Sequence, residues 1–167
     1  DLDMLHQLAS VIEQATAAYE QFDHARALEV TETFFWSFCD DYLELVKNRA
    51  YADGDSAQEG NPGQQSAISA LRLALDAMLR LFAPVIPFAT EEVWSWQHEG
   101  SIHQAAWPTV EELGLGNNDY PGLYSVTSEA LIVIRRAKTD RQLSQRAPLT
   151  RVALAAPELL AHAAADL

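Results

Sequence analysis

The chain has 167 residues, 49% of them hydrophobic, which is the composition of a folded globular domain and excludes a disordered segment. No apolar run approaches the ~20 residues that a membrane-spanning helix needs, and a single cysteine excludes an internal disulfide, so we expect a cytoplasmic protein without a membrane partner. The net charge of −13 argues against RNA, yet residues 135–151 carry six basic side chains against one acidic, which leaves a basic strip of +5.

Apolar side chains at spacings of three and four residues predict a first helix that packs against other helices. Its stripe consists of Leu5, Leu8, Ile12, Ala15, Tyr19 and Phe22. Asp3 is the expected N-cap, because a carboxylate there accepts from the free amides of the first turn. A second helix is expected over about residues 23–47. Its apolar side is wide, and we interpret Trp36, Phe38 and Tyr42 as core.

The polar side of this second helix carries Asp40, Asp41 and Glu44. Carboxylates at i and i+4 share a helix face. No histidine falls at a ligand spacing, so we interpret them as solvated side chains and expect no metal site. Cys39 has aromatic neighbours and is expected to be a buried, unreactive thiol. Residues 53–65 are rich in Gly, Pro, Asp and Gln and predict a surface loop.

The next elements are a third helix over about residues 66–83 and a short fourth helix over about 88–97. A flank of small residues on the third helix would let a neighbouring helix approach closely. It comprises Ala67, Ala70, Ala74 and Ala77. Pro84 ends this helix, because the residue before a proline is disfavoured in the α region. Residues 101–108 then predict an extended strap, anchored by Trp107.

The last part of the chain predicts a helix, a strand and a short helix. The helix covers about residues 125–143, with Val126, Ala130, Val133 and Ala137 facing inward. Thr150 to Ala155 alternates like a strand, whose partner is either the strap or a segment outside this chain. We therefore expect a mainly α fold with three parts. These are a helical bundle (1–98), a strap and loop (99–122) and a short strand-containing C-terminal part (123–167).

The sequence lacks the common catalytic and nucleotide-binding motifs, including a Ser nucleophile elbow, Cys-x-x-Cys, His-Glu-x-x-His and Gly-x-Gly-x-x-Gly. Its five histidines are scattered over expected helix surfaces and loops, where capping or solvated roles are more common than catalysis. From the residues alone we expect a helical bundle with no catalytic group and no cofactor. Both RNA and protein remain open as its partner.

Three stretches carry a family resemblance. Residues 34–51 (FFWSFCDDYLELVKNRAY) resemble the Trp-x-x-Phe-Cys-Asp-Trp-Tyr-Leu-Glu segment of valyl-tRNA synthetases. Residues 70–96 resemble the class I synthetase pattern in which a leucine-rich helix leads into His-Pro-x-x-Pro-Phe-x-Thr-Glu-Glu-x-Trp, with Ala83 in place of the His. Residues 101–108 (SIHQAAWP) resemble the strap that follows it. The isoleucyl and leucyl enzymes are the nearest alternatives, and the Phe38-Cys39-Asp40 run favours the valyl family. A helical protein-interaction module that never binds RNA is the alternative from another class.

The resemblance implies the anticodon-binding helical bundle of class I synthetases, a fragment whose partner is the anticodon stem-loop of valine tRNA. It also implies that aminoacylation, with ATP and Mg, belongs to a catalytic domain of the same parent chain, beside an editing domain. RNA readout by such a bundle needs flat side chains and cations. Basic residues at helix ends or on polar faces are the candidate RNA contacts. They are Lys47, Arg49, Arg72 and Arg80, with Arg135, Arg136, Lys138 and Arg141 as auxiliary phosphate contacts.

Overall fold

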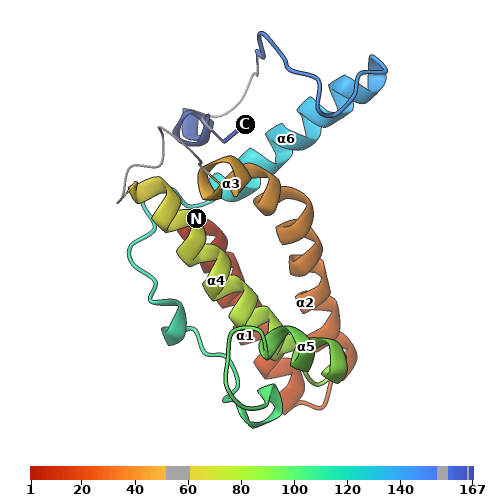
Figure 1. Ribbon diagram of the computed structural model, residues 1–167, viewed down its shortest axis with the longest axis vertical. Helices are drawn as coiled ribbons and strands as arrows, with labels where there is room; N and C mark the ends of the chain where they lie inside the picture. The colour runs from red at the N-terminus through yellow and green to blue at the C-terminus, as the bar shows by residue number, and fades with distance from the viewer. Residues whose placement is uncertain (52–60, 154–157, 165) are drawn as a thin grey trace.

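The computed structural model describes residues 1–51, 61–153, 158–164 and 166–167. Within these ranges the chain is helical, as predicted, and contains no strand. Three long helices, α1 (Leu2–Glu20), α2 (His24–Ser37) and α4 (Pro62–Phe82), pack against one another along the length of the molecule (Figure 1). None of the described helices combines the length and the apolar character that crossing a bilayer would require.

The apolar stripe of α1 forms the centre of the core. Leu8 and Ala15 are fully buried and Ile12 is 2% exposed, which confirms the predicted face. Phe22 does not belong to this face, because α1 ends at Glu20 and the chain reverses through Phe22 with a left-handed φ of 58°. The Phe22 side chain is 83% exposed, so its placement in the stripe was wrong.

The predicted second helix is a continuous helical path with a π-helical interruption. α2 leads into a π-helical segment, Phe38–Tyr42, and then into α3 (Leu43–Ala50). Phe38 and Tyr42 are buried with their rings stacked 5.4 Å apart, as predicted. Trp36 is 55% exposed, so its assignment to the core was wrong. The buried face passes through Phe34 and Phe38, which are one helical turn apart, and Trp36 lies between them on the outer side.

The alanine flank of α4 is its most buried face. Ala67, Ala70, Ala74 and Ala77 are each no more than 2% exposed, and the absence of larger side chains lets α4 approach α1 closely. The helix begins at Pro62, four residues before the predicted start, because Asn61 accepts hydrogen bonds from the first free amides and Pro62 suits the first turn. The loop prediction was therefore wrong for residues 62–65, and residues 53–60 lie outside the described ranges.

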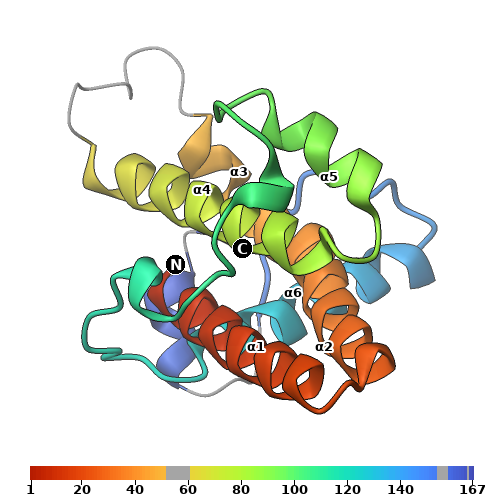
Figure 2. The same ribbon diagram turned by 90° about the horizontal axis from the view of Figure 1, so that it is seen from below.

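The strap after α5 (Pro87–Trp94) packs back onto the bundle. The strap was predicted to be extended, but it contains a short 3-10 helical turn, Ile102–Gln104. Trp107 is its anchor, as predicted, because the indole Nε1 donates to Thr16 Oγ1 on α1 at 2.8 Å. Figure 2 shows this strap crossing the face of α4.

The helix α6 (Leu123–Asp140) starts on the bundle and projects away from it (Figure 1). Asp3 was predicted to cap α1, but it caps α6 instead. Its carboxylate accepts hydrogen bonds from the backbone amides of Gly122 and Tyr124 at 3.0 and 2.8 Å. The cap of α1 is Asp1. Val133 is 55% exposed, so its inward placement was wrong.

The predicted strand, Thr150 to Ala155, is absent from the part that the structure describes. Residues 150–153 have no strand partner, and residues 154 and 155 lie outside the described ranges. An alternating pattern cannot form a ladder unless another segment supplies the paired backbone groups. The last element, predicted as a short helix, is a 3-10 helix, Glu158–Ala163.

Candidate nucleic-acid interface

Large aromatic side chains are exposed at the end of the bundle where α1 turns into α2 and α4 turns into α5. Phe22 is 83%, Phe88 90% and Trp96 68% exposed. Both turns lie at the bottom of Figure 1. We call this surface the aromatic end. Exposing large apolar rings to water is unfavourable, and aromatic rings on a surface offer flat faces on which unstacked bases can stack.

A groove of about 580 Å³ separates these two turns. Its lining residues are Thr16, Tyr19, Glu20, His24, Pro84, Val85 and Trp107. Three aromatic rings form its wall: Tyr19 is 5.5 Å from the His24 ring and meets Trp107 edge to face at 5.3 Å. We call this the turn groove. Flat walls with one carboxylate, that of Glu20, can hold a planar base and accept from an exocyclic amino group.

The sequence interpretation missed this end of the molecule. Tyr19 and Phe22 both match the spacing of the α1 stripe, and spacing alone cannot show that the helix ends between them. The signal that separates them is Asp23, a capping residue, whose carboxylate accepts from the Arg26 amide at 3.0 Å to start α2. A residue directly before such a cap lies in a turn, where the side chain is free of the helical face.

Arg72 and Arg80, two of the predicted RNA contacts, differ in their surroundings although both lie four residues from Asp76. Arg80 is 9% exposed, donates to Asp76 Oδ2 at 2.7 Å and to the Ala106 carbonyl at 3.2 Å, and also binds the Glu112 carboxylate. This hydrogen bond, together with the guanidinium charge, lowers the pKa of Glu112 below its usual range. Arg72 is exposed and has no hydrogen bond or ion pair with any residue that the structure describes.

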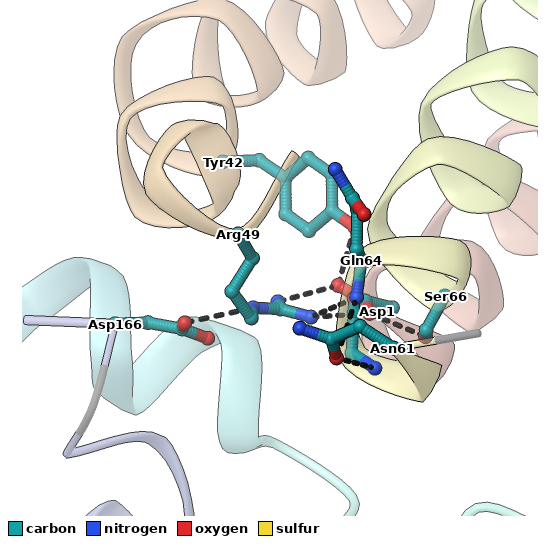
Figure 3. Close-up of polar contacts among 8 residues, drawn as sticks. Asp1, Tyr42, Arg49, Asn61, Gln64, Ser66 and Asp166 are labelled. Atoms are coloured by element: carbon teal, nitrogen blue, oxygen red, sulfur yellow. Dashed lines mark hydrogen bonds and ion pairs between the residues drawn. The ribbon is translucent and has the colours of Figure 1, made fainter. Parts of the chain in front are cut away.

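Arg49 lies at the centre of a polar cluster at the other end of the bundle (Figure 3). Its two terminal nitrogens bind the Asp1 carboxylate at 2.9 and 2.8 Å, and Nε donates to Asp166 at 2.8 Å. The Tyr42 hydroxyl also donates to Asp1, at 2.7 Å, and burial raises the pKa of Tyr42 far above its ordinary value. Ser66 donates to the same carboxylate. The guanidinium thus joins the starts of α1 and α4 to the C-terminal segment.

The remaining predicted contacts lie on α3 and α6. Lys47 is half exposed and paired with Glu44 on its own helix. On α6, Arg135 pairs with Asp41 at 3.3 Å, and Lys138 and Arg141 each donate to a backbone carbonyl, at 2.8 and 3.2 Å.

Arg136 is exposed and has no polar partner among the described residues. The C-terminal half of α6, which carries it, projects at the end of the molecule opposite the aromatic end (Figure 1). The eight predicted side chains therefore do not form one surface.

Cys39 is partly buried, and burial, followed by the charge of Asp40, raises the pKa of its thiol. This favours the unreactive thiol that the sequence predicts. Among the described residues, no three His, Cys, Asp or Glu side chains are grouped so that they could hold a metal ion.

Comparison with known proteins identifies the family to which this chain belongs. The family model for the anticodon-binding domain of tRNA ligases matches residues 1–154. The chain belongs to the anticodon-binding domain family of tRNA ligases.

Its curated relatives include several valine–tRNA ligases. That of Leifsonia xyli subsp. xyli is 56% identical over 157 residues, which cover 94% of this chain and 18% of the relative. The ligase of Thermobifida fusca is 52% identical over 153 residues (91% and 17%), and that of Cutibacterium acnes 50% over 158 residues (94% and 18%). The chain thus spans less than a fifth of the length of these relatives. The predicted resemblance to the valyl family is confirmed.

Proposed function

We propose that this chain is the anticodon-binding domain of a valine–tRNA ligase and that its aromatic end binds the anticodon stem-loop of valine tRNA. The observation that carries the proposal is the position of exposed Phe22 beside the aromatic turn groove, in a chain of the anticodon-binding family. Single-stranded RNA is recognised by stacking its unstacked bases on aromatic side chains and bonding their edges. The aromatic walls of the turn groove suit stacking of a base, and the Glu20 carboxylate can accept a hydrogen bond from the base edge.

The cations have different roles in this proposal. Arg72 and Arg136 are exposed and have no polar partners among the residues that the structure describes, which supports direct phosphate contacts. Lys47, Lys138 and Arg141 would join them after exchanging weak local bonds for phosphate oxygens. The other three predicted contacts are each paired with a carboxylate: Arg49, Arg80 and Arg135. Their carboxylate partners support a positional role, in which each holds a segment that bears the RNA surface.

The rest of the proposal concerns the longer protein. Its catalytic and editing domains would be further partners of this domain, and ATP and Mg would act in the catalytic domain during aminoacylation of valine tRNA. We infer a cytoplasmic location from the free thiol and from the function itself.

The test is binding of a valine-tRNA anticodon stem-loop over a salt series, with a stem-loop of mismatched anticodon beside it. Phe22→Ala should weaken binding of the matched stem-loop about tenfold, the size of one lost base stack. Tyr51→Ala is the matched control, because Tyr51 is also a largely exposed aromatic (79%) but directly follows α3, away from the aromatic end. Equal affinities of the two variants, or no preference for the matched anticodon, would contradict the proposal.

A further inference from the structure

A second groove, of about 370 Å³, lies between α4 and the end of α5. Its floor is apolar and its rim is polar. The apolar lining, which we call the floor, consists of Leu73, Leu75, Leu79 and Val93, and the polar lining, which we call the rim, consists of Arg72, Asp76, Gln97 and His98. We call it the α4–α5 groove. Its volume falls in the range of small-ligand pockets, roughly 300–1,000 Å³.

His98 is held rigidly at this rim. Its imidazole stacks on the indole of Trp94 with ring centroids 3.7 Å apart and planes inclined by 14°. On its edge, Nε2 lies 2.8 Å from Asp76 Oδ1, an ion pair when the ring is protonated. The His98 side chain is nevertheless 38% exposed, and His98 lines the groove whereas Trp94 does not. Trp94 therefore covers one face of the imidazole, and the groove borders the part of the ring that is still exposed.

Within the described part of the chain, no side chain or carbonyl binds the Arg72 guanidinium, which leaves it open to a ligand. Asp76, the acid four residues further along α4, is bound by Arg80 at 2.7 Å. Arg72 has no ion pair in the described ranges, and Asp76, which also lines the groove, has its charge offset by Arg80. An exposed cation beside a flat ring and an apolar floor is suited to a ligand with a planar part and an anionic part.

We propose that the α4–α5 groove binds one unstacked nucleotide of the RNA. The base lies over the apolar floor against His98 and extends the Trp94–His98 stack to three rings, the Gln97 amide bonds the base edge, and Arg72 pairs with the adjoining phosphate. This site is separate from the turn groove, since the two share no lining residue. The proposal rests on the proposed function, because it takes RNA as the ligand.

The choice of a nucleotide follows from the chemistry of the rim. A peptide strand would need backbone donors and acceptors at the groove, and the described elements here are helices whose backbone groups are already bonded. Inorganic phosphate alone would leave the apolar floor uncovered. A nucleotide uses the cation, the amide and the flat surface together.

The experiment uses a valine–tRNA ligase in which this chain replaces the matching stretch, so that the domain has its neighbours. The probe is a valine-tRNA anticodon stem-loop carrying 2-aminopurine at each loop position in turn. On binding, one loop position should show a fluorescence change that is lost in His98→Ala and kept in His98→Phe, which retains a flat ring on Trp94. Arg72→Ala should weaken binding about tenfold, the loss of one charge-assisted contact.

Arg146→Ala is the matched control, because it removes the same charge from an exposed arginine whose side chain has no polar partner in the described ranges. Equal affinities of the Arg72 and Arg146 variants at one salt concentration would overturn the groove proposal, as would fluorescence that does not depend on His98. If Phe22→Ala still weakens binding in that case, the proposed function stands without this groove. Absence of any stem-loop binding by the unmutated ligase overturns both.

Discussion

Arg80 offers the sharpest test of how the bundle is held together. Its guanidinium connects α4 to the strap through the Ala106 carbonyl and to the Glu112 carboxylate beyond it. It also offsets the Asp76 carboxylate one turn earlier on α4. Arg80→Ala would remove the arginine donor from two carboxylates and a carbonyl, of which Asp76 keeps His98 Nε2 at 2.8 Å. We expect this variant to be strongly destabilised, and Arg72→Ala, on the same helix, to be close to wild type.

The size of the effect follows from the burial of the partners. Removing one member of a buried ion pair costs about 3–5 kcal/mol. The Asp76 and Glu112 side chains are 30% and 41% exposed, so water can rehydrate them after the truncation and the cost falls near the lower limit. We expect a loss of about 3 kcal/mol, or a decrease in Tm of roughly 6–12 °C for a domain of this size. For Arg72, which is exposed and unpaired within the described ranges, the expected change is within about 0.5 kcal/mol.

The assay is urea unfolding of the chain at neutral pH, followed by circular dichroism, with thermal unfolding as a second measure. Glu112→Ala in both backgrounds completes a double-mutant cycle that isolates the Arg80–Glu112 contribution. A free energy of unfolding for Arg80→Ala within 0.5 kcal/mol of the Arg72→Ala value would refute the reasoning, since it would mean that the three-way pairing adds no stability.

Three further results are expected. Because the hydrogen bond from Arg80 lowers the pKa of Glu112 below its ordinary 4.5, its contribution is fully present above that pH and is lost as the pH falls through the lowered value. Wild type should therefore lose more unfolding free energy between pH 5 and about pH 3 than Glu112→Gln, and equal losses would contradict the pairing. Ala74→Leu should cost about 1–3 kcal/mol in urea unfolding, because Ala74 is fully buried where α4 approaches α1; Ser69→Leu, on an exposed position of α4, is its control. Since burial raises its thiol pKa, Cys39 should react with iodoacetamide far more slowly in the folded chain than in urea, and similar rates would show an accessible thiolate.

Most helices were predictable because their signals are local. The α1 stripe, the alanine flank of α4 and the stop at Pro84 each depend on residues within a few turns of one another, and the structure has all three. Trp107 was also recognisable as an anchor, since a lone tryptophan in a polar strap is stable only against another element. The family resemblance was equally local, carried by three contiguous stretches of sequence.

The sequence by itself thus determined the helical class, the order of the main helices and the family, because periodicity and motifs are local features of the chain. Only the tertiary structure decided what each polar side chain does. Asp3 caps a helix that starts 120 residues later, and Arg80 is buried by a strap while Arg72 on the same helix is exposed. Phe22 became a surface ring because α1 ends two residues before it. Such outcomes depend on which distant segments meet, and spacing along one helix carries no information about that.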